Sequence, residues 1–266
     1  MVGCSRFTYL NDSANAAKYH EYLNGYSGVR IAYDNLTKTA FEVYPEQNTS
    51  RGAFVKAMLG QGNADITFGP EVGMGEILSK TEHNNKIFLI KYACGASNLL
   101  DDWAAPSSGR ISGLYDRFVR YVRAQIKVLQ DEGFAPSIRA MCWMQGEGDS
   151  YPGYSIEYLS QLSYFVGDLR EELLEFCDGV EFAFIDAGIS DSPMWLEYAT
   201  VNTAKEQFAA QSERNVYIDT IEHGLTTSLE PAEEPDLAHY DSASMIELGH
   251  LFAEALLPFL STPVSL

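Results

Sequence analysis

The sequence predicts an α/β fold in which helices cover both faces of a parallel sheet. Short apolar runs alternate along the chain with longer segments of helical periodicity, and these runs are apolar almost throughout. Continuous apolar runs are typical of parallel strands that are buried on both faces, whereas half-exposed strands alternate between apolar and polar residues. A chain of 266 residues with 46% hydrophobic content can fill one large core. Since no repeat or linker divides the sequence, we predict a single domain over residues 1–266.

Five segments are predicted to be strands because β-branched and aromatic residues are concentrated in them. They are residues 29–33, 86–94, 137–144, 180–187 and 216–219. Amphipathic helices are expected between them. One helix is indicated by apolar residues that recur every three or four positions over 114–129, and Gly133 would end it. Two further helices are predicted over residues 158–176 and from about 241 to 259, the last of them ending near Pro263.

The charge balance argues against nucleic acid and anionic membranes as partners. The chain has 18 basic and 37 acidic residues, which gives a formal net charge of -19. A chain with this excess of negative charge repels a phosphate backbone or an anionic lipid surface. We therefore expect neither nucleic acid nor a membrane as a partner, and the sequence carries no signal for an oligomeric state.

The cysteines and the apolar segments bear on the compartment. The four cysteines, Cys4, Cys94, Cys142 and Cys177, form no CxxC pair, which argues against a zinc site and a small disulfide scaffold. No stretch reaches the roughly 18 apolar residues of a membrane span, and the first residues show no signal-peptide pattern. We expect a cytoplasmic protein as the chain stands, and this expectation would change if the natural chain started further upstream.

Polar segments follow two of the predicted strands and precede the last predicted helix. Residues 95–98, Gly-Ala-Ser-Asn, come directly after one strand, and residues 145–147, Gln-Gly-Glu, come after the next. In open parallel sheets, ligands bind at the carboxyl ends of the strands. The connection of about twenty residues before the last helix contains Asp236 and His239, and loops of this length are often functional. We therefore expect the three segments to meet at one edge of the sheet.

The pair Asp236 and His239 allows two interpretations. A carboxylate three residues before a histidine can bind Nδ1 and fix the tautomer, so that Nε2 accepts a proton from a hydroxyl. The same spacing also arises often by chance. Gln145 and Glu147 have a similar alternative, since both side chains can serve only the backbone of a tight turn at Gly146. No glycine-rich loop follows a predicted strand, which disfavours a phosphate- or nucleotide-binding domain.

The segments Trp143-Met-Gln-Gly-Glu-Gly-Asp149 and Asp236-Leu-Ala-His239 resemble the SGNH hydrolase superfamily. Within it they are similar to the sialic acid acetylesterase and acetylxylan esterase branch, which is like carbohydrate esterase family 6. The resemblance extends from about residue 3 to residue 255. It implies a three-layer α/β/α sandwich with a five-stranded parallel sheet, as in flavodoxin-like folds. Further matches are Phe68-Gly-Pro-Glu71, Lys91-Tyr-Ala-Cys-Gly95 and Asp102-Trp103.

The activity that the resemblance implies is that of a serine hydrolase. It would remove O-acetyl groups from a carbohydrate, which is an acetylated sugar, a xylan-derived oligosaccharide or sialic acid. The first family motif, Gly-Gln-Ser-Asn, would fall on Gly3-Cys4-Ser5-Arg6, so Ser5 would be the nucleophile. Because Cys4 and Arg6 replace Gln and Asn, an alternative is a carbohydrate-binding pseudoenzyme with a degenerate nucleophile motif. A further alternative is the thiol of Cys4 as nucleophile in place of Ser5.

The implied mechanism is acyl transfer in two steps. His239 would deprotonate Ser5, whose oxygen attacks the acetyl carbonyl, and would then protonate the departing sugar hydroxyl. Water would hydrolyse the acetyl-enzyme by the reverse relay. Asp236 is the first candidate to orient His239. Glu147 is the rival, because in this branch of the family the glutamate of the Gln-Gly-Glu motif has also been given the acid's role.

The resemblance also implies an oxyanion hole and substrate contacts. The backbone N–H groups of Ser5 and Gly95 and the side-chain amide of Gln145 would bind the oxyanion, where loss of one donor typically costs about 10² to 10³ in rate. Asn98 and Trp103 are expected to contact the substrate, since they lie in or beside the matched segments. The chemistry requires no metal or organic cofactor.

Overall fold

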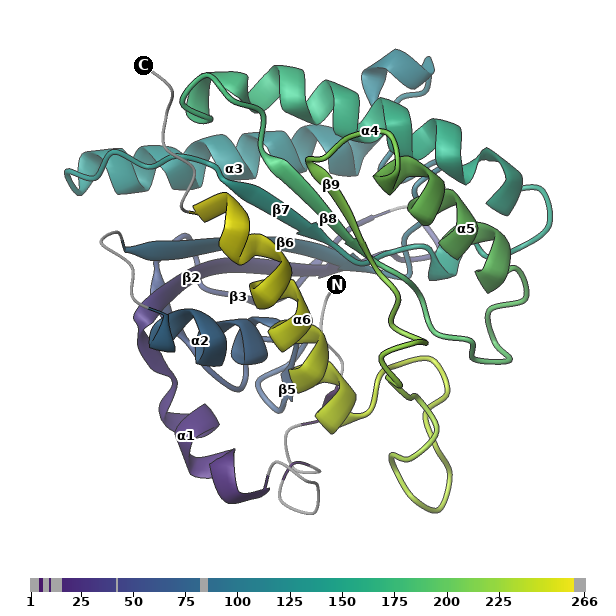
Figure 1. Cartoon of the computed structure of the whole chain (residues 1–266), viewed down its shortest axis with the longest axis horizontal. Coiled ribbons are helices and arrows are strands. Elements are labelled where there is room, and N and C mark those ends of the chain that lie inside the picture. The colour runs from purple at the N-terminus through teal and green to yellow at the C-terminus, as the bar shows by residue number, and fades with distance from the viewer. Residues whose placement is uncertain (1–4, 7–9, 11–15, 42, 82–85, 261–266) are drawn as a thin grey trace. The chain divides into compact units, whose positions relative to one another are not determined.

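The computed structural model of the chain is shown in Figure 1, and it describes residues 5–6, 10, 16–41, 43–81 and 86–260. The chain divides into two compact units. The predicted single domain over residues 1–266 stays a prediction. Unit 1 comprises Met1–Ala96, Ser192–Met194 and Ile221–Glu254, and unit 2 comprises Ser97–Asp191, Trp195–Thr220 and Ala255–Leu266.

Unit 1 is built around one long strand, β2 (Tyr26–Thr37), which pairs with three others. β6 is parallel to it, whereas β3 and β4 are antiparallel to it. Val29 and Ile31 of β2 are completely buried, as expected for a strand in a hydrophobic core. The partner strands are β3 (Glu46–Thr49), β4 (Val55–Ala57) and β6 (Ile87–Gly95).

A separate antiparallel pair of strands in unit 1 carries Ser5. β1 (Ser5–Arg6) pairs with β5 (Thr67–Phe68), and Ser5 lies opposite Phe68. The Phe68 side chain is completely buried, so β5 is anchored in the core. The helical segments of this unit are η2 (Ala16–Lys18), α1 (Tyr19–Asn24), α2 (Glu71–Lys80) and the greater part of α6 (Ser242–Leu260).

α6 is an apolar helix that packs closely on α2. A Cβ on Gly73 would overlap the carbonyl of Ile246, and a Cβ on Gly249 would overlap the carbonyl of Pro70, so both positions require glycine. By length and composition α6 is also apolar enough to cross a membrane, which differs from the expectation that no segment is. Half of this stretch is buried inside the protein, as in the core helix of a globular domain.

Unit 2 contains a parallel sheet in the order β7, β8, β9 (Figure 1). Every residue of β8 is buried, as expected for a central strand. The helices α3, α4 and α5 lie alongside this sheet in Figure 1, and α5 contacts β8 and β9. These elements are β7 (Ala140–Trp143), β8 (Ala183–Ala187), β9 (Asn215–Ile218), α3 (Gly113–Asp131), α4 (Tyr158–Leu173) and α5 (Tyr198–Ala209). Single 3₁₀ turns are η3 (Pro106–Ser108), η4 (Glu147–Asp149), η5 (Ser155–Glu157) and η6 (Leu174–Phe176).

The five predicted strands are all present, and their parallel pairing confirms the α/β class. The expected five-stranded sheet is corrected, because the pairing in the described residues joins them as one pair, β2 and β6, and one trio, β7 to β9. The antiparallel strand β3 was not predicted because it is polar and no residue in it is buried. It therefore lacks the apolar run that identified the other strands.

Candidate active site

Ser5 lies on β1 in contact with the loop that carries the predicted histidine. The Ser5 side chain is buried, and its Oγ donates a hydrogen bond to the backbone carbonyl of Tyr240 at 2.6 Å. Tyr240 is the residue after His239. The structure thus brings Ser5 and the histidine loop together within unit 1. The neighbouring Gly3 and Cys4, and with them the alternative thiol nucleophile, lie outside the described residues.

Asp236 and His239 make the contact that their spacing predicted. Nδ1 of His239 lies 2.7 Å from Oδ2 of Asp236, and the other carboxylate oxygen accepts the N–H of Ala238 at 3.0 Å. Burial alone would raise the pKa of Asp236, but the hydrogen bonds from His239 and Ala238 outweigh it and lower this pKa below its ordinary value. The carboxylate is therefore ionised where it can hold the imidazole in one orientation.

Two acidic residues, the buried Asp241 and the half-buried Glu230, fix the loop around His239, and sequence reasoning missed both. Asp241 is 3% exposed and accepts hydrogen bonds from the Thr226 hydroxyl at 2.6 Å and from the N–H of Glu230 at 2.9 Å. Glu230 in turn accepts both the N–H and the hydroxyl of Ser242, at 2.7 and 2.6 Å, at the start of α6. The carboxylates of Glu230 and Asp241, which lie on either side of His239 in the sequence, thus hold the loop in place. Their partners lie eleven or more residues away, and no short motif signals them.

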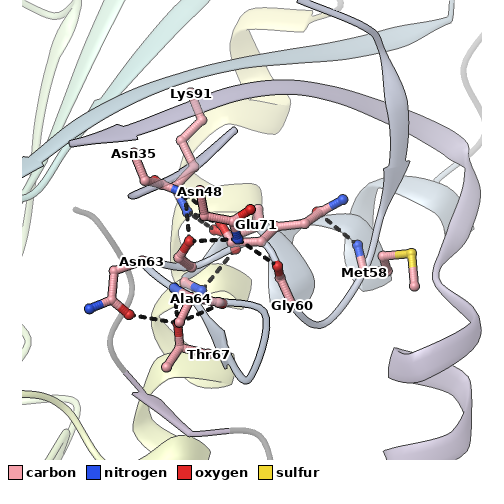
Figure 2. A network of polar contacts seen from close by, with 12 residues as sticks. Asn35, Asn48, Met58, Gly60, Asn63, Ala64, Thr67, Glu71 and Lys91 are labelled. Atoms are coloured by element: carbon pink, nitrogen blue, oxygen red, sulfur yellow. Dashed lines mark hydrogen bonds and ion pairs between the residues drawn. The ribbon is translucent and has the colours of Figure 1, made fainter. Parts of the chain in front are cut away.

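A buried polar network supports β5, the partner strand of β1, and is drawn in Figure 2. Glu71 is 2% exposed and pairs with Lys91, whose Nζ lies 2.9 Å from Oε2, while the other oxygen accepts the N–H of Gly69 at 2.8 Å. Lys91 also donates to the carbonyl of Gln61 at 2.8 Å, and Asn35 donates to the same carbonyl at 3.0 Å. Because Gly69 directly follows β5, the ion pair holds the backbone that pairs with the Ser5 strand.

Gly95 stands at the carboxyl end of β6, as predicted. It lies opposite Thr37 in the ladder with β2, and its carbonyl accepts the N–H of Lys38 at 2.9 Å. The chain turns directly afterwards, because Ala96 has a positive φ of 58°. This is an uncommon conformation for a residue with a side chain, and such turns often occur at functional sites.

Gln145 is held by three neighbours in unit 2. Its Nε2 donates to Asp149 at 2.6 Å and to the carbonyl of Ser97 at 3.3 Å. The Tyr158 hydroxyl lies 3.0 Å from the Gln145 carbonyl and 3.2 Å from its Oε1. The tight turn after Gln145 is present, since Gly146 has a φ of 141° and a Cβ there would meet Val201 at 2.7 Å. Both N–H groups of the Gln145 amide therefore have acceptors.

Asp149 lies at the centre of the hydrogen bonds that hold the segment 145–149, a role that its position in the sequence did not indicate. It is 1% exposed and accepts the N–H groups of Leu99 and Leu100 at 2.8 and 3.1 Å, besides the amide of Gln145. Burial raises the pKa of Asp149 to about 6, although these hydrogen bonds act to lower it. The carboxylate ties the loop after β6 to the loop after β7. Glu147, in contrast, is only half-buried.

The two residues expected to contact substrate differ in their surroundings. Asn98 is half-buried and its Oδ1 accepts the N–H of Asp101 at 2.7 Å, which stabilises a turn. Trp103 is 2% exposed, donates to the hydroxyl of Ser97 at 2.9 Å, and packs edge-on against Trp143. Trp143 is also buried. Trp103 has the environment of a core residue, and its contact with substrate stays a prediction.

A buried ion pair at the carboxyl end of β8 was also not predicted. Nζ of Lys205 lies 2.6 Å from Oδ1 of Asp186 and donates to the carbonyl of Ala187 at 2.9 Å. Both side chains are almost completely buried, and the ammonium lies 5.6 Å from the centre of the Tyr158 ring. Burial raises the pKa of Asp186 to about 6, against the lowering effect of Lys205. The sign of this ion pair in the sequence is a single aspartate, Asp186, within an otherwise apolar strand.

A family model and several solved structures are similar to this chain. A family model described as carbohydrate esterase, sialic acid-specific acetylesterase, matches residues 53–258. A search of curated proteins finds no match. Among solved structures, NanS superposes with a TM-score of 0.64 at 14% identity, covering 90% of this chain and 90% of NanS.

Two further solved structures share the fold. A protein from Arabidopsis thaliana has a TM-score of 0.58 at 19% identity, covering 84% of this chain and 80% of that chain. A carbohydrate acetylesterase from Xanthomonas citri has a TM-score of 0.58 at 13% identity, covering 94% of this chain and 53% of that chain. At these identities the structural likeness establishes the fold alone. Because the family model matches well over half of the chain, the protein belongs to the carbohydrate esterase, sialic acid-specific acetylesterase family, and it is a carboxylic ester hydrolase.

Proposed function

We propose that this carbohydrate esterase removes O-acetyl groups by acyl transfer through Ser5, with His239 as general base and Asp236 as its orienting carboxylate. The supporting observation is that one loop carries Asp236, His239 and the backbone carbonyl that accepts the Ser5 hydroxyl. His239 contacts Asp236 at 2.7 Å, and the carbonyl of the next residue, Tyr240, accepts the hydroxyl of Ser5 at 2.6 Å. A serine, an imidazole and a carboxylate are the three groups that this chemistry requires.

The first step needs a change in the hydrogen bond of Ser5. Its hydroxyl donates to the Tyr240 carbonyl, and the proposed mechanism requires that it donates to Nε2 of His239 instead. Catalytic hydrogen bonds of this kind often form only when substrate is bound. His239 then takes the proton while the Ser5 oxygen attacks the acetyl carbonyl, and the tetrahedral intermediate expels the sugar oxygen, which His239 protonates. Water cleaves the acetyl-serine, and acetate leaves.

The developing negative charge needs donors. The backbone N–H groups of Ser5 and Gly95 are proposed for this role. Gly95 is the last residue of β6, and the chain turns directly after it at Ala96. Gln145 is proposed as a third donor. Of its two hydrogen bonds, the 3.3 Å contact to the Ser97 carbonyl is the longer, and an oxyanion would replace this one at least cost, since charged acceptors bind more strongly.

Hydrolysis of 4-nitrophenyl acetate tests the proposal. Wild-type protein should release 4-nitrophenol. Ser5→Ala and His239→Ala should each reduce the rate of hydrolysis, and the two variants should have the same residual rate. An acetyl group on Ser5, found by mass spectrometry after acid quench, would identify the intermediate. Wild-type turnover no faster than that of the two variants would contradict the serine mechanism. It would leave the alternative of a carbohydrate-binding pseudoenzyme, which the family membership does not favour.

A further inference from the structure

Asp241 lies between the proposed catalytic groups and the start of α6, all of them within unit 1. The two residues before it are His239, the proposed general base, and Tyr240, whose carbonyl accepts the Ser5 hydroxyl at 2.6 Å. The residue after it, Ser242, begins α6 and is completely buried. Because consecutive Cα atoms stay about 3.8 Å apart, contacts that fix the backbone of Asp241 also limit the movement of the two residues before it.

Every polar group of Asp241 is hydrogen-bonded. Its carboxylate accepts the Thr226 hydroxyl at 2.6 Å and the N–H groups of Leu229 and Glu230 at 3.1 and 2.9 Å. Its backbone N–H donates to the carbonyl of Thr226 at 2.9 Å, and its own carbonyl accepts the N–H of Met245 at 2.9 Å. Hydrogen bonds to a carboxylate are stronger than those between neutral groups. Asp241 therefore ties the first turn of α6 to the segment that contains Thr226 and Glu230.

The same contacts reach the orienting carboxylate from its other side. Glu230, whose N–H is bound by Asp241, uses its carbonyl to accept the N–H of Asp236 at 2.9 Å. The carbonyl of Asp236 in turn accepts the N–H of His239 at 3.3 Å. Hydrogen bonds thus lead from Asp241 through Glu230 to Asp236. The chain itself leads from Asp241 back to His239, so one carboxylate is tied to both members of the proposed pair.

Hydrogen bonds alone hold the Asp241 carboxylate, since it makes no ion pair with any of the described residues. Oδ1 accepts the N–H groups of Leu229 and Glu230, and Oδ2 lies 2.6 Å from the Thr226 hydroxyl. An asparagine of the same shape can keep these contacts, with its oxygen in place of Oδ1 and its N–H group donating to the hydroxyl of Thr226. An alanine loses all of them.

We propose that Asp241 is a positioning residue for acyl transfer. It keeps the Asp236–His239 pair in place relative to the Ser5 hydroxyl by tying together the two ends of the loop 231–240. This role rests on the proposed function, to which it adds a residue that touches neither the substrate nor the reacting atoms. Acyl transfer depends on such placement, because a shift of about 1 Å in a catalytic group can lower the rate roughly 10²-fold.

Steady-state kinetics with 4-nitrophenyl acetate test this role. Asp241→Ala should lower kcat about 10- to 100-fold and leave KM within about 2-fold of wild type, because the loop is loosened and no substrate contact is removed. Asp241→Asn should keep kcat within about 3-fold of wild type, since the amide can retain the hydrogen bonds. This recovery would show that the placement of the loop matters and that the negative charge does not.

A second variant weakens the same contacts less severely. Thr226→Val removes only the hydroxyl that the Asp241 carboxylate accepts at 2.6 Å. It should lower kcat about 2- to 10-fold, as the loss of one hydrogen bond to a carboxylate does, and leave KM unchanged. If Asp241→Ala does not fold, this variant decides, and a wild-type kcat in it would then contradict the positioning role.

Glu76→Ala is the matched control for a general loss of stability. Glu76 is a carboxylate of unit 1 that is 2% exposed, and it accepts hydrogen bonds from Lys80 and from the Tyr22 hydroxyl at 2.8 Å each. Its removal should destabilise the fold but leave kcat unchanged at a temperature at which the protein stays folded. An equal fall of kcat in Glu76→Ala and Asp241→Ala would overturn the proposal.

Amide hydrogen exchange, followed by NMR, measures the order of the loop without turnover. The N–H of Asp236 should exchange faster in Asp241→Ala than in wild type, because its acceptor on Glu230 is released. Glu76→Ala should leave this rate unchanged. Unchanged exchange in Asp241→Ala, or a wild-type kcat, would overturn the positioning role. Failure of the proposed function is a separate outcome, seen as wild-type turnover by Ser5→Ala, and the exchange rates then decide alone whether Asp241 orders the loop.

Discussion

The hydroxyl of Ser5 donates a hydrogen bond to the backbone carbonyl of Tyr240, 2.6 Å away and 235 residues later in the sequence. The contact is buried, because Ser5 is 5% and Tyr240 is 4% exposed. It fastens β1 to the loop in which His239 and Asp236 are paired. The loop thus sets the position of the serine as well as the orientation of the imidazole.

Removal of the Ser5 hydroxyl should separate its two roles. Ser5→Ala is expected to abolish 4-nitrophenyl acetate hydrolysis, and it should lower the free energy of unfolding by only about 1–3 kcal/mol, the cost of leaving the Tyr240 carbonyl without its donor. Ser108→Ala is a matched control, since Ser108 also donates to a backbone carbonyl, that of Ala105, at 2.6 Å. It should retain full activity. Substantial turnover by Ser5→Ala would contradict the nucleophile assignment.

The carboxylate that orients His239 can be identified by comparing two variants. Asp236→Asn should reduce kcat roughly 10²- to 10⁴-fold, because an amide can stabilise the wrong imidazole tautomer. Glu147→Gln should have a much smaller effect, since the contact seen is that of Asp236 with Nδ1 at 2.7 Å. Both kcat values are measured with 4-nitrophenyl acetate. The reverse order of effects would assign the orienting role to Glu147.

Local spacing predicted part of the site, and distant contacts account for the remainder. Asp236 and His239 lie three residues apart, so their contact could be expected from the sequence. The partners of Asp149 are the backbone N–H groups of Leu99 and Leu100, about fifty positions earlier. No motif connects such groups, because the folding of the intervening chain alone brings them together. The sequence therefore indicated the local contact of Asp236 with His239, but not the distant contacts of Asp149.

The elements of the fold show the same division. β8, which was predicted, is buried along its whole length, and burial requires the apolar residues that make the strand recognisable. β3 was missed because its residues Glu46–Thr49 are polar, and it is a strand through its backbone pairing with β2. The periodicity of the sequence also does not show which strands pair with one another in a sheet. The expected sheet of five strands came from the family resemblance and required correction.

Substitution of only one partner of the Glu71–Lys91 ion pair should strongly lower the free energy of unfolding. Lys91→Met leaves the carboxylate of Glu71, which is 2% exposed, buried without its cation, and we expect a loss of about 3–5 kcal/mol in urea unfolding. The double variant Glu71→Gln/Lys91→Met should recover part of this loss. As a control, Lys127→Met removes an exposed partner of Asp131 and should cost under about 1 kcal/mol. Equal effects of the two lysine substitutions would show that the Glu71 network is unimportant for stability.

The raised pKa of Asp149 should appear in the pH dependence of stability. Burial raises this pKa from 3.8 to about 6, so the folded protein binds the proton more tightly than the unfolded chain does. The stability from this group is complete below about pH 4 and is lost as the pH rises through 6, with a total of about 3 kcal/mol. Asp149→Asn lacks the titration. Its free energy of unfolding minus that of wild type should therefore increase between pH 4 and pH 7.

Asp236→Asn provides a control of opposite sign for that measurement. The pKa of Asp236 is lowered in the folded protein, since the hydrogen bonds from His239 and Ala238 outweigh burial. Its contribution to stability is therefore present above the unfolded pKa and is lost as the pH falls through the folded value. The difference between Asp236→Asn and wild type should decrease as the pH rises to about 4 and stay level above it, whereas that of Asp149→Asn increases between about pH 4 and pH 7. A flat difference for Asp149→Asn would mean that the Leu99 and Leu100 amides hold the carboxylate without the cost of burial.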